Sequence, residues 1–389
     1  MKFLYSHRTR SADGQYVHIR ELTDALRARG HDIVMAGPHG EREGAAKDLN
    51  AGGGQWRSAL PGALYELAEL AYCAPAYWRL RTLYSKTQPD ILYQRYNLFY
   101  HPGVWLKRAK NIPLMLEVNA PLAEERARHG GLSLEGVARK TEAAIWRAAD
   151  MVLPVTHVLA AKLRAAGVAD EKITVIQNGA SEEFLSPHDG GAVRARYNLE
   201  GKLILGFSGF VRDWHGVDRV VGAIARLRRP DLHLLLVGDG PARAGLEALA
   251  RDLGIASQLT ITGVVQRSEM PDHIAAFDIA LQPAVTDYAS PLKVFEYMAL
   301  AKPILAPASA NICEVLKDRE DAALFDEQDS GDFDTALEAL IEDGDLRARL
   351  GAAARASLIR QDLTWAGNAR RVETIAQMLL GNNSEGDKT

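Results

Sequence analysis

Cysteine is scarce in this sequence, and no apolar run is long enough to cross a membrane. The 389 residues include two cysteines, Cys73 and Cys313, which are far apart and each lie among apolar neighbours. This pattern favours two small buried side chains over a disulfide or a zinc site. The longest apolar stretches, at residues 151–159 and 232–237, fall far short of the ~18–20 residues that span a bilayer. These absences argue against a redox centre, a zinc framework and an integral membrane protein.

A signal peptide and an extreme charge are also lacking. The first ten residues, MKFLYSHRTR, turn basic before an apolar core of ~7 residues has formed, so they are typical of a first strand, and we expect a cytoplasmic protein. The net charge of −4 gives no electrostatic reason to expect nucleic acid as a partner. Residues 1–185 carry 24 Lys and Arg against 20 Asp and Glu. This mild excess suits an acidic acceptor or an anionic membrane surface, although a difference of this size also arises by chance.

What the sequence does have is a regular alternation of short apolar, β-rich runs with helical patterns, which is typical of βαβ units. The alternation stops between Pro187 and Gly201, a stretch of Pro, Gly and charged residues, where we place a linker. We therefore predict an α/β fold of two Rossmann-like parallel-sheet domains, residues 1–186 and 187–364, facing a central cleft. Residues 365–389 supply a helix at about Trp365–Leu380, which packs on the second domain or crosses back to the first, and a polar tail, Gly381–Thr389, expected to be disordered.

The predicted strands fall into two series, one for each domain. Ligands of such sheets bind beyond the carboxyl ends of the strands, so the loops after the strands are where chemistry is expected. The first helix is predicted at Tyr16–Arg29. The first series of strands is Phe3–Ser6, Ile33–Ala36, Ile91–Gln94, Leu114–Val118, Met151–Pro154 and Thr174–Gln177. The second series is Leu203–Ser208, Leu232–Gly238, Leu259–Thr262, Ile279–Gln282 and Pro303–Ala306.

The segment TDYASPLKVFEYMA, residues 286–299, directly follows a predicted strand. Ser290 is a good N-cap and Pro291 suits the first helical position, so a helix should begin here and present free backbone N–H groups to an anion. Lys293 lies in the first turn, where a cation opposes the helix dipole, a placement easier to understand if it meets a phosphate. Glu296 lies on the same face of the helix, where its carboxylate could accept a hydrogen bond from a ribose hydroxyl. The spacing fits a surface helix with a Lys–Glu pair equally well.

Six segments of the chain, taken together, resemble the retaining glycosyltransferases of family 4, which have the GT-B fold. They occur in the family's order and spacing over nearly the whole chain. The segments are GHDIVMAGP, VIQNGASEEF, FSGFVRDWHG, LLVGDGP, ITGVVQRSEMPDHIAAFDIALQP and SPLKVFEYMALAKPILAP. The resemblance implies a glycosyltransferase whose donor substrate is a nucleotide diphosphate sugar.

The resemblance assigns a donor site to the second domain. Glu296 would bind the donor ribose as the last residue of a Glu, seven residues, Glu motif, whose first position is occupied by Tyr288 in this chain. The adjacent Asp287 would contact the donor sugar instead. The alternative is contact through backbone amides alone, those of Ala289, Ser290 and Leu292.

The loop after the strand Leu203–Ser208 would meet the donor phosphates. Family members commonly place an Arg and a Lys here, and the matching positions hold Phe210 and His215, with Arg212 nearby. Arg212 offers a bidentate fork and His215 a weaker, pH-dependent donor, unless His215 only packs at a helix start. The other residues that the resemblance places at the nucleotide are Gly209, Gly238 and Val265, of which Val265 suits the core equally well.

In the first domain, three residues follow predicted strands. Gly14, in the turn 11–15, permits close backbone approach to a phosphate or an acceptor, or belongs to a plain Asp-Gly turn. Asn119 lies where family members often carry a residue that contacts the transferred sugar. Arg95 is the best candidate for holding an acidic acceptor group, although a salt bridge between loops is the commoner role of such an arginine.

Two further features of the sequence are a pair of aspartate triplets and an aromatic segment. The triplets Asp332–Asp334 and Asp343–Asp345 lie without a preceding strand, so we interpret them as helix-start and loop acids and expect no metal site. The apolar and aromatic segment Pro61–Tyr84 packs within the first domain, shapes an acceptor pocket, or rests on a membrane surface.

The sequence thus predicts a retaining glycosyltransferase that needs no metal or other cofactor and transfers a sugar to a hydroxyl of a glycan, a lipid-linked acceptor or a small molecule. The residues expected to act in transfer are Asn119, Arg212, Lys293 and Glu296. The protein would be free in the cytoplasm or peripheral to the inner membrane. The main alternative is a non-catalytic nucleotide-binding subunit of the same fold, and a sugar-nucleotide epimerase is a more distant one. An NAD-dependent enzyme would need an intact glycine fingerprint, which is missing.

Overall fold

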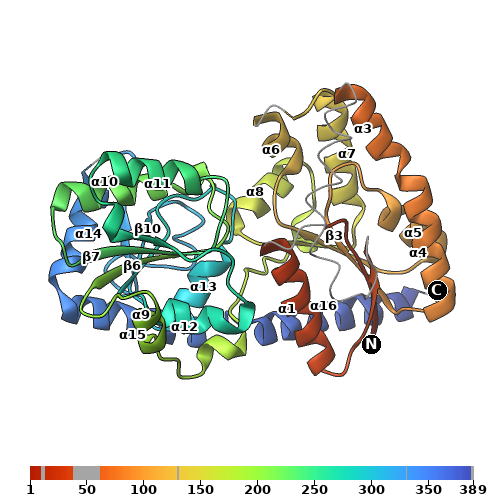
Figure 1. Ribbon diagram of the computed structural model, residues 1–389. Coiled ribbons are helices and arrows are strands. Elements are labelled where there is room, and N and C mark those ends of the chain that lie inside the picture. The colour runs from red at the N-terminus through yellow and green to blue at the C-terminus, as the bar shows by residue number, and fades with distance from the viewer. Residues whose placement is uncertain (10–13, 38–61, 129–130, 330, 387–389) are drawn as a thin grey trace. The chain divides into compact units, whose positions relative to one another are not determined.

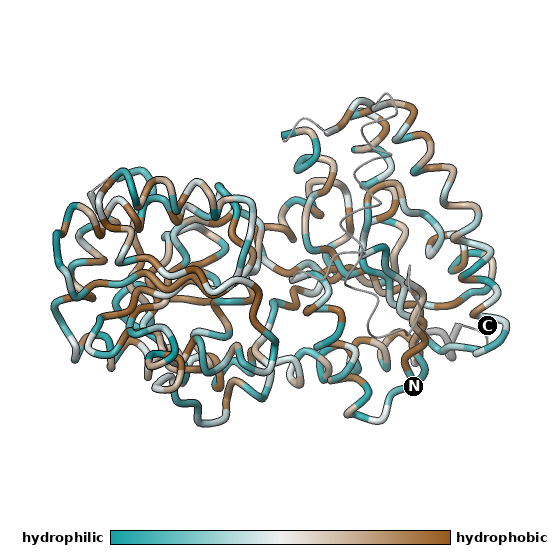
Figure 2. Tube along the Cα trace, in the orientation of Figure 1, coloured by the Kyte–Doolittle hydropathy of each residue, from teal (hydrophilic) through white to brown (hydrophobic). Residues whose placement is uncertain are grey.

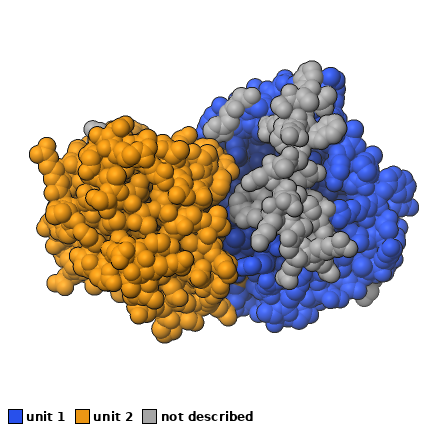
Figure 3. Space-filling view, viewed as in Figure 1, with its two compact units in different colours: residues 1–177, 366–389 blue, residues 178–365 orange. Residues whose placement is uncertain are grey.

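The computed structural model describes residues 1–9, 14–37, 62–128, 131–329 and 331–386, and the chain forms two compact units. Unit 1 comprises Met1–Gln177 with Ala366–Thr389, and unit 2 comprises Asn178–Trp365 (Figure 3). The boundary falls before the predicted one at residue 186, because the segment from Asn178 is bonded into unit 2. Asn178 donates its side-chain amide to the carbonyl of Ser290 at 2.5 Å.

Unit 1 is built on a five-stranded parallel sheet with the order β2-β1-β3-β4-β5. Two predicted strands, β4 and β5, have the predicted bounds, and three others differ by one residue at an end. The strands are β1 (Lys2–Ser6), β2 (Asp32–Ala36), β3 (Ile91–Arg95), β4 (Leu114–Val118) and β5 (Met151–Pro154). All residues of β3, β4 and β5 are buried, as expected for parallel strands covered by helices on both faces.

The predicted strand Thr174–Gln177 does not form. Its backbone runs beside β5, with hydrogen bonds from Thr174 N–H to Val152 O and from Ile176 N–H to Pro154 O, but the pairing amounts to a single bridge. The segment is also only half-buried, so the edge of the sheet stays at β5.

The helices of unit 1 pack around its sheet (Figure 1). They are α1 (Gly14–Ala28), α3 (Gly62–Ala71), α4 (Cys73–Thr87), α5 (Pro102–Lys110), α6 (Leu122–Arg128), α7 (Glu135–Ala148), α8 (His157–Ala165) and α16 (Trp365–Gly386). The helix α16 extends past the predicted end at Leu380 into the tail that was expected to be disordered. From Ala366 on it belongs to unit 1.

The aromatic segment predicted at Pro61–Tyr84 forms α3 and most of α4; Pro61 itself lies outside the described residues. One face packs into unit 1 through Cys73, Ala76 and Leu80. The other face is exposed, with Trp78 at 60% of its full accessibility. Within the described ranges, no helix combines the length and apolar character needed to cross a membrane.

Unit 2 is built on a six-stranded parallel sheet with the order β11-β10-β9-β6-β7-β8. Its strands are the most hydrophobic part of the unit (Figure 2). The strand β6 has the predicted bounds, four others differ slightly, and β11 was not predicted. They are β6 (Leu203–Ser208), β7 (Leu232–Val237), β8 (Leu259–Ile261), β9 (Ile279–Leu281), β10 (Ile304–Pro307) and β11 (Ala323–Phe325).

Two hydrophobic clusters cover the two faces of this sheet. One includes residues of α9 (Gly191–Arg196), α12 (Met270–Ala275), α13 (Leu292–Ala299) and α15 (Gly344–Arg360). The other includes residues of α10 (Val217–Leu227), α11 (Arg243–Asp252) and α14 (Asp332–Glu342). Successive side chains of β6 alternate between the clusters, because neighbours on a strand point to opposite faces.

Two predictions about unit 2 are wrong. The stretch Pro187–Gly201 is no linker: it contains α9, and a Cβ placed on Gly190 would lie 2.3 Å from the backbone of Ala276, so this stretch packs tightly into the unit. Cys313 is exposed rather than buried, whereas Cys73 is buried as predicted and donates to the carbonyl of Phe99 at 2.9 Å.

Candidate functional site

Three glycines hold two loops together at the carboxyl ends of β6 and β7. Gly209, Gly238 and Gly240 have φ of +119°, +141° and +159°. A Cβ on Gly238 would lie 2.1 Å from the carbonyl oxygen of Gly209, and one on Gly240 would lie 2.0 Å from that of Val211. Any side chain at residue 238 or 240 would therefore push the loops apart. Gly238 was predicted to let the backbone approach a nucleotide; here its missing side chain makes room for Gly209.

The helix α13 starts one residue later than predicted. Pro291 is its N-cap, and no side chain caps it. Ser290, the predicted N-cap, is instead bonded to Asn178: its hydroxyl accepts the Asn178 backbone N–H at 3.2 Å. The preceding loop is held by Asn311, whose side-chain amide donates to the carbonyls of Thr286 and Ala289 at 3.0 and 2.7 Å. No side chain caps the first turn of α13; the Val294 N–H donates to the Pro291 carbonyl at 3.1 Å, so the N–H groups of Leu292 and Lys293 are those that can meet an anion.

Lys293 projects from this first turn to the end of β6. Its Nζ lies 3.6 Å from the centre of the Phe207 ring. A Cβ on Gly209 would lie 3.7 Å from the same atom. Burial lowers the pKa of Lys293 to about 7, although Glu296 acts in the opposite direction. The ammonium forms no hydrogen bond or ion pair with any described residue, so a cation has been placed here at a cost in stability.

Arg212 lies in the loop after β6, and its charge, like that of Lys293, acts on His215. Its guanidinium lies over the exposed rings of Phe210 and Trp214, at 5.2 and 4.8 Å from their centres. It makes no ion pair with the described part of the chain. Stacking fixes the plane of a guanidinium while leaving its N–H groups free to bind.

His215 lies in the short 3₁₀ helix Asp213–His215 and is neutral. Its Nδ1 accepts the backbone N–H of Arg212 at 3.0 Å, which assigns the proton to Nε2. Burial, together with the charges of Lys293 and Arg212, lowers the pKa of His215 to about 3. The prediction of a pH-dependent donor is therefore wrong near neutral pH, where His215 carries a permanent Nε2–H.

Glu296 follows Lys293 by one helical turn and is buried. It forms an ion pair with Arg267, whose guanidinium lies 4.7 Å from the centre of the Phe184 ring. Arg267 was not identified in the sequence, because it lies 29 residues away and no spacing rule connects the two. The pair orients the Glu296 carboxylate.

The remaining predicted donor-site residues differ in exposure. Asp287 is exposed, whereas Tyr288, at the altered motif position, is buried. Leu292 is half-buried. Val265 is half-buried and packs against the core cluster, while its neighbour Val264 is exposed.

Asn119 of unit 1 belongs to a buried polar cluster centred on Glu117, which the sequence did not reveal. Glu117 accepts hydrogen bonds from Asn119 Nδ2 at 2.6 Å and from the Tyr93 hydroxyl at 2.9 Å. It also pairs with Arg95 and, at 3.1 Å, with His18 Nε2. Burial alone would raise the pKa of Glu117, but His18, Arg95 and the hydrogen bonds hold it well below its usual range.

This cluster decides between the two interpretations of Arg95. Arg95 and Glu117 are direct neighbours on β3 and β4, and both are buried. The guanidinium is therefore engaged in a salt bridge, the alternative to holding an acceptor. Asn119 is half-buried and oriented by its bond to Glu117. Gly14 is the exposed first residue of α1, and residues 11–13 of its turn lie outside the described residues.

The aspartate triplets are helix-start residues. Asp332 opens α14, and Asp343 caps α15 by accepting the backbone N–H of Leu346 at 2.8 Å. In the part of the chain that the structure describes, no group of three or more His, Cys, Asp and Glu is placed to hold a metal ion.

The two halves of the chain match the models of two families. Residues 13–179 match the model described as "Glycosyl transferase 4-like domain". Residues 192–357 match the model described as "Glycosyl transferases group 1". The two matches correspond closely to units 1 and 2.

Two curated relatives are similar over part of the chain. A D-inositol 3-phosphate glycosyltransferase of Stackebrandtia nassauensis is 32% identical over 212 residues, which cover 51% of this chain and 47% of the relative. A GDP-mannose-dependent alpha-(1-6)-phosphatidylinositol monomannoside mannosyltransferase of Mycolicibacterium smegmatis is 27% identical over 58% of this chain and 62% of the relative. The match therefore spans less than two thirds of the length of these relatives.

A solved structure shares the fold. Anabaena HepE, in complex with UDP, has a TM-score of 0.76 with this chain at 17% sequence identity. The match covers 97% of this chain and 100% of that protein. At this identity the likeness concerns the fold.

Proposed function

Since the chain belongs to the glycosyl transferases group 1 family and has the GT-B fold, we propose that it transfers a sugar from a nucleotide diphosphate sugar to a hydroxyl group, with retention at the anomeric carbon and without a metal ion. The observation that carries this proposal is the pair of cations at the end of β6. Lys293 and Arg212 form no ion pair with the described residues, the charges of both act on His215, and Lys293 lies in the first turn of α13, which no side chain caps. Such an arrangement suits a diphosphate.

The donor would be held from two sides. The first turn of α13, Lys293 and Arg212 bind the diphosphate, and the Nε2–H of His215 supplies a neutral donor nearby. Glu296, oriented by its ion pair with Arg267, accepts hydrogen bonds from the ribose hydroxyls. The backbone of Gly209 and Gly238 lines this position, and Val265 lies towards the base. Asp287, or the amides of Ser290 and Leu292, contact the sugar.

Transfer would depend mainly on electrostatic stabilisation. As the bond between the anomeric carbon and the phosphate oxygen breaks, negative charge grows on the diphosphate and is stabilised by Lys293, Arg212 and the α13 amides. The acceptor oxygen bonds to the anomeric carbon on the same face, and its proton passes to the leaving phosphate oxygen. Asn119, oriented by Glu117, is proposed to contact the transferred sugar, with Gly14 near the acceptor.

The acceptor would be a hydroxyl of a glycan, a lipid-linked molecule or a small molecule. The two curated relatives are named for D-inositol 3-phosphate and for phosphatidylinositol monomannoside, so acceptors containing phosphate belong in the first trials. The exposed aromatic face of α4 allows weak contact with a membrane surface where such acceptors are lipid-linked.

A non-catalytic nucleotide-binding subunit is the second candidate, because Tyr288 and Phe210 occupy positions where charged residues are common in the family.

One experiment separates the enzyme from the non-catalytic subunit. The purified protein is screened by thermal shift and by sugar release against a panel of nucleotide diphosphates and their sugars, with and without a chelator. Stabilisation by one nucleotide, with slow sugar release in the chelator and an unchanged anomeric configuration by NMR, supports the enzyme. Stabilisation without turnover, even with acceptor extracts, supports the subunit. No stabilisation by any nucleotide would contradict the donor site itself.

A further inference from the structure

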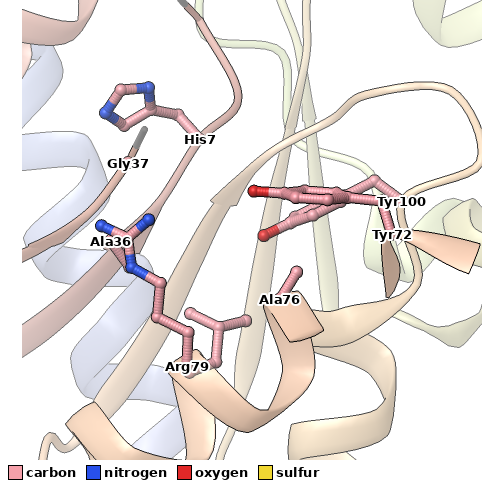
Figure 4. Close-up of a pocket in the computed structure, with 8 residues that line it drawn as sticks. His7, Ala36, Gly37, Tyr72, Ala76, Arg79 and Tyr100 are labelled. Atoms are coloured by element: carbon pink, nitrogen blue, oxygen red, sulfur yellow. The ribbon is translucent and has the colours of Figure 1, made fainter. Parts of the chain in front are cut away.

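A small pocket opens in unit 1 where β1, β2 and β3 end, against the first half of α4 (Figure 4). His7 follows β1, Ala36 and Gly37 end and follow β2, and Tyr100 lies in the loop after β3. Tyr72, Ala76, Arg79 and Leu80 line the pocket from the start of α4. The pocket thus occupies the edge of the sheet at which ligands of parallel α/β sheets bind, and none of its residues belongs to the donor site of unit 2.

One arginine lines this pocket, and a second packs on two of its lining rings. Arg79 lines it directly and is exposed. Arg8 lies over two of the lining rings, with its Cζ 4.9 Å from the centre of Tyr72 and 5.5 Å from that of Tyr100. The Nη1 atom of Arg8 is buried and has no hydrogen-bond partner among the described residues. Neither arginine forms an ion pair with the described chain, and none of the described residues that line the pocket carries a carboxylate.

Neutral donors complete the lining. Figure 4 shows the hydroxyl groups of Tyr72 and Tyr100 pointing the same way, towards the side on which His7 and Arg79 lie. The Tyr100 hydroxyl lies 3.4 Å from that of Ser6. Gly37 leaves space for the imidazole, since a Cβ there would lie 2.1 Å from His7 Nε2. Any side chain at residue 37 would therefore displace the His7 imidazole from its position in the pocket.

We propose that this pocket binds a phosphate monoester, and that the group belongs to the acceptor. A phosphate monoester carries close to two negative charges at neutral pH and three strong acceptor oxygens. It matches two guanidinium groups and several neutral donors better than a carboxylate does, because guanidinium binds phosphate in a bidentate manner. The assignment to the acceptor rests on the proposed function, which places the donor on unit 2.

The test measures binding of glycerol 3-phosphate and of inorganic phosphate to the full chain by isothermal titration calorimetry. The variants are Arg79→Gln and Arg8→Gln, and the matched control is Lys86→Gln, which removes an exposed cation from the same helix outside the pocket. Each pocket variant should weaken binding about tenfold or more, since each removes a charge-assisted contact. The control should bind as the wild type does.

Two further arms make the outcomes distinct. Vesicles of phosphatidylcholine with a minority of phosphatidic acid present the same group on a lipid, so vesicle binding that the pocket variants abolish would identify a lipid-borne source. Stabilisation by UDP, measured on the same preparations, should be unchanged in all variants and reports on folding and on unit 2. The proposal is overturned if wild-type protein binds UDP but neither phosphate probe nor vesicles, or if the pocket variants bind as tightly as the control. Failure of UDP binding in the wild type would instead contradict the proposed function.

Discussion

In unit 1, the charged groups at the ends of β3 and β4 pair with each other, whereas in unit 2 two cations near the end of β6 form no ion pair with the described residues. In unit 1, Glu117 gathers Arg95, His18 and Asn119 into a cluster whose members satisfy one another. In unit 2, Lys293 and Arg212 have only aromatic rings against them within the described structure. A buried charge that is already paired stabilises and orients its neighbours. A half-buried cation without a partner destabilises the free protein, and a bound anion offsets that cost.

The largest effect should come from breaking the cluster of unit 1. Glu117→Gln removes the only carboxylate that pairs with Arg95 among the described residues and leaves a buried cation, so the free energy of unfolding should fall by about 3–5 kcal/mol. Chemical denaturation followed by circular dichroism measures this. The control Asp170→Asn breaks the exposed pair with Arg164 and should cost about 1 kcal/mol or less. Equal losses in the two variants would show that the cluster is not the stabilising feature.

The next effect concerns function rather than stability. Lys293→Met removes the unpaired cation of unit 2, so sugar transfer or sugar release should fall by about 100- to 1000-fold, as when one preorganised donor is removed from a site that stabilises developing charge. The protein should unfold at the same or a higher temperature, because a desolvated charge has been lost. The control Lys317→Met removes an exposed cation of the same unit. If Lys293→Met lowered the stability but left the transfer rate unchanged, Lys293 would act as a stabilising residue, as the paired charges of unit 1 do, and not as a binding residue.

A smaller effect is expected one helical turn further on. Glu296→Gln removes the carboxylate proposed to hold the ribose, and affinity for the nucleotide should weaken by about 1.5–3 kcal/mol, the range for a hydrogen bond to a charged group. Calorimetry with UDP and with a ribose-free pyrophosphate separates the two contributions, since only UDP binding should weaken. Glu320→Gln, at an exposed position, serves as the control. An equal loss for pyrophosphate would mean that Glu296 acts through Arg267 or Lys293 instead.

The smallest effect is a pH dependence. Burial lowers the pKa of Lys293 to about 7, and a bound diphosphate favours the charged form and raises it again, so binding takes up a proton above that pH. Affinity for UDP should therefore fall as the pH rises above about 7, by at most about tenfold per unit. His215, with its pKa lowered to about 3, should contribute nothing in this range. Calorimetry in buffers of different ionisation enthalpy counts the protons, and the slope should disappear in Lys293→Met.

The sequence was informative where local pattern decides the structure. The strand β4 and the strand β6 were predicted with their exact bounds, because each is a short apolar run between turn residues. The segment 286–299 was predicted to contain a helix start, and α13 begins there, since capping preferences are local; the anion site stays a prediction. Even there the cap was misplaced by one residue, because Ser290 bonds to Asn178 across the fold.

Contacts between distant residues could not be predicted. Arg267 reaches Glu296 from another loop, and Glu117 collects its partners from β3 and α1. The exposure of Cys313 and the packing of Gly190 against Ala276 likewise depend on which elements become neighbours. Composition and periodicity describe one element at a time, so they place candidate residues at strand ends without showing which of them neutralise one another.

The path of the chain has a consequence for synthesis on the ribosome. Unit 2 is continuous, so it can complete its fold once Trp365 has emerged. Unit 1 begins first but cannot be completed until α16 has been made, because Glu373 of α16 pairs with Arg29 and Asn368 donates to the carbonyl of Gln177 at 2.8 Å. The surface of unit 1 that α16 covers therefore stays exposed while the whole of unit 2 is translated. Messages that stop after Trp365 would yield a finished unit 2 joined to an unfinished unit 1, a product that cellular quality control would recognise by its exposed apolar surface.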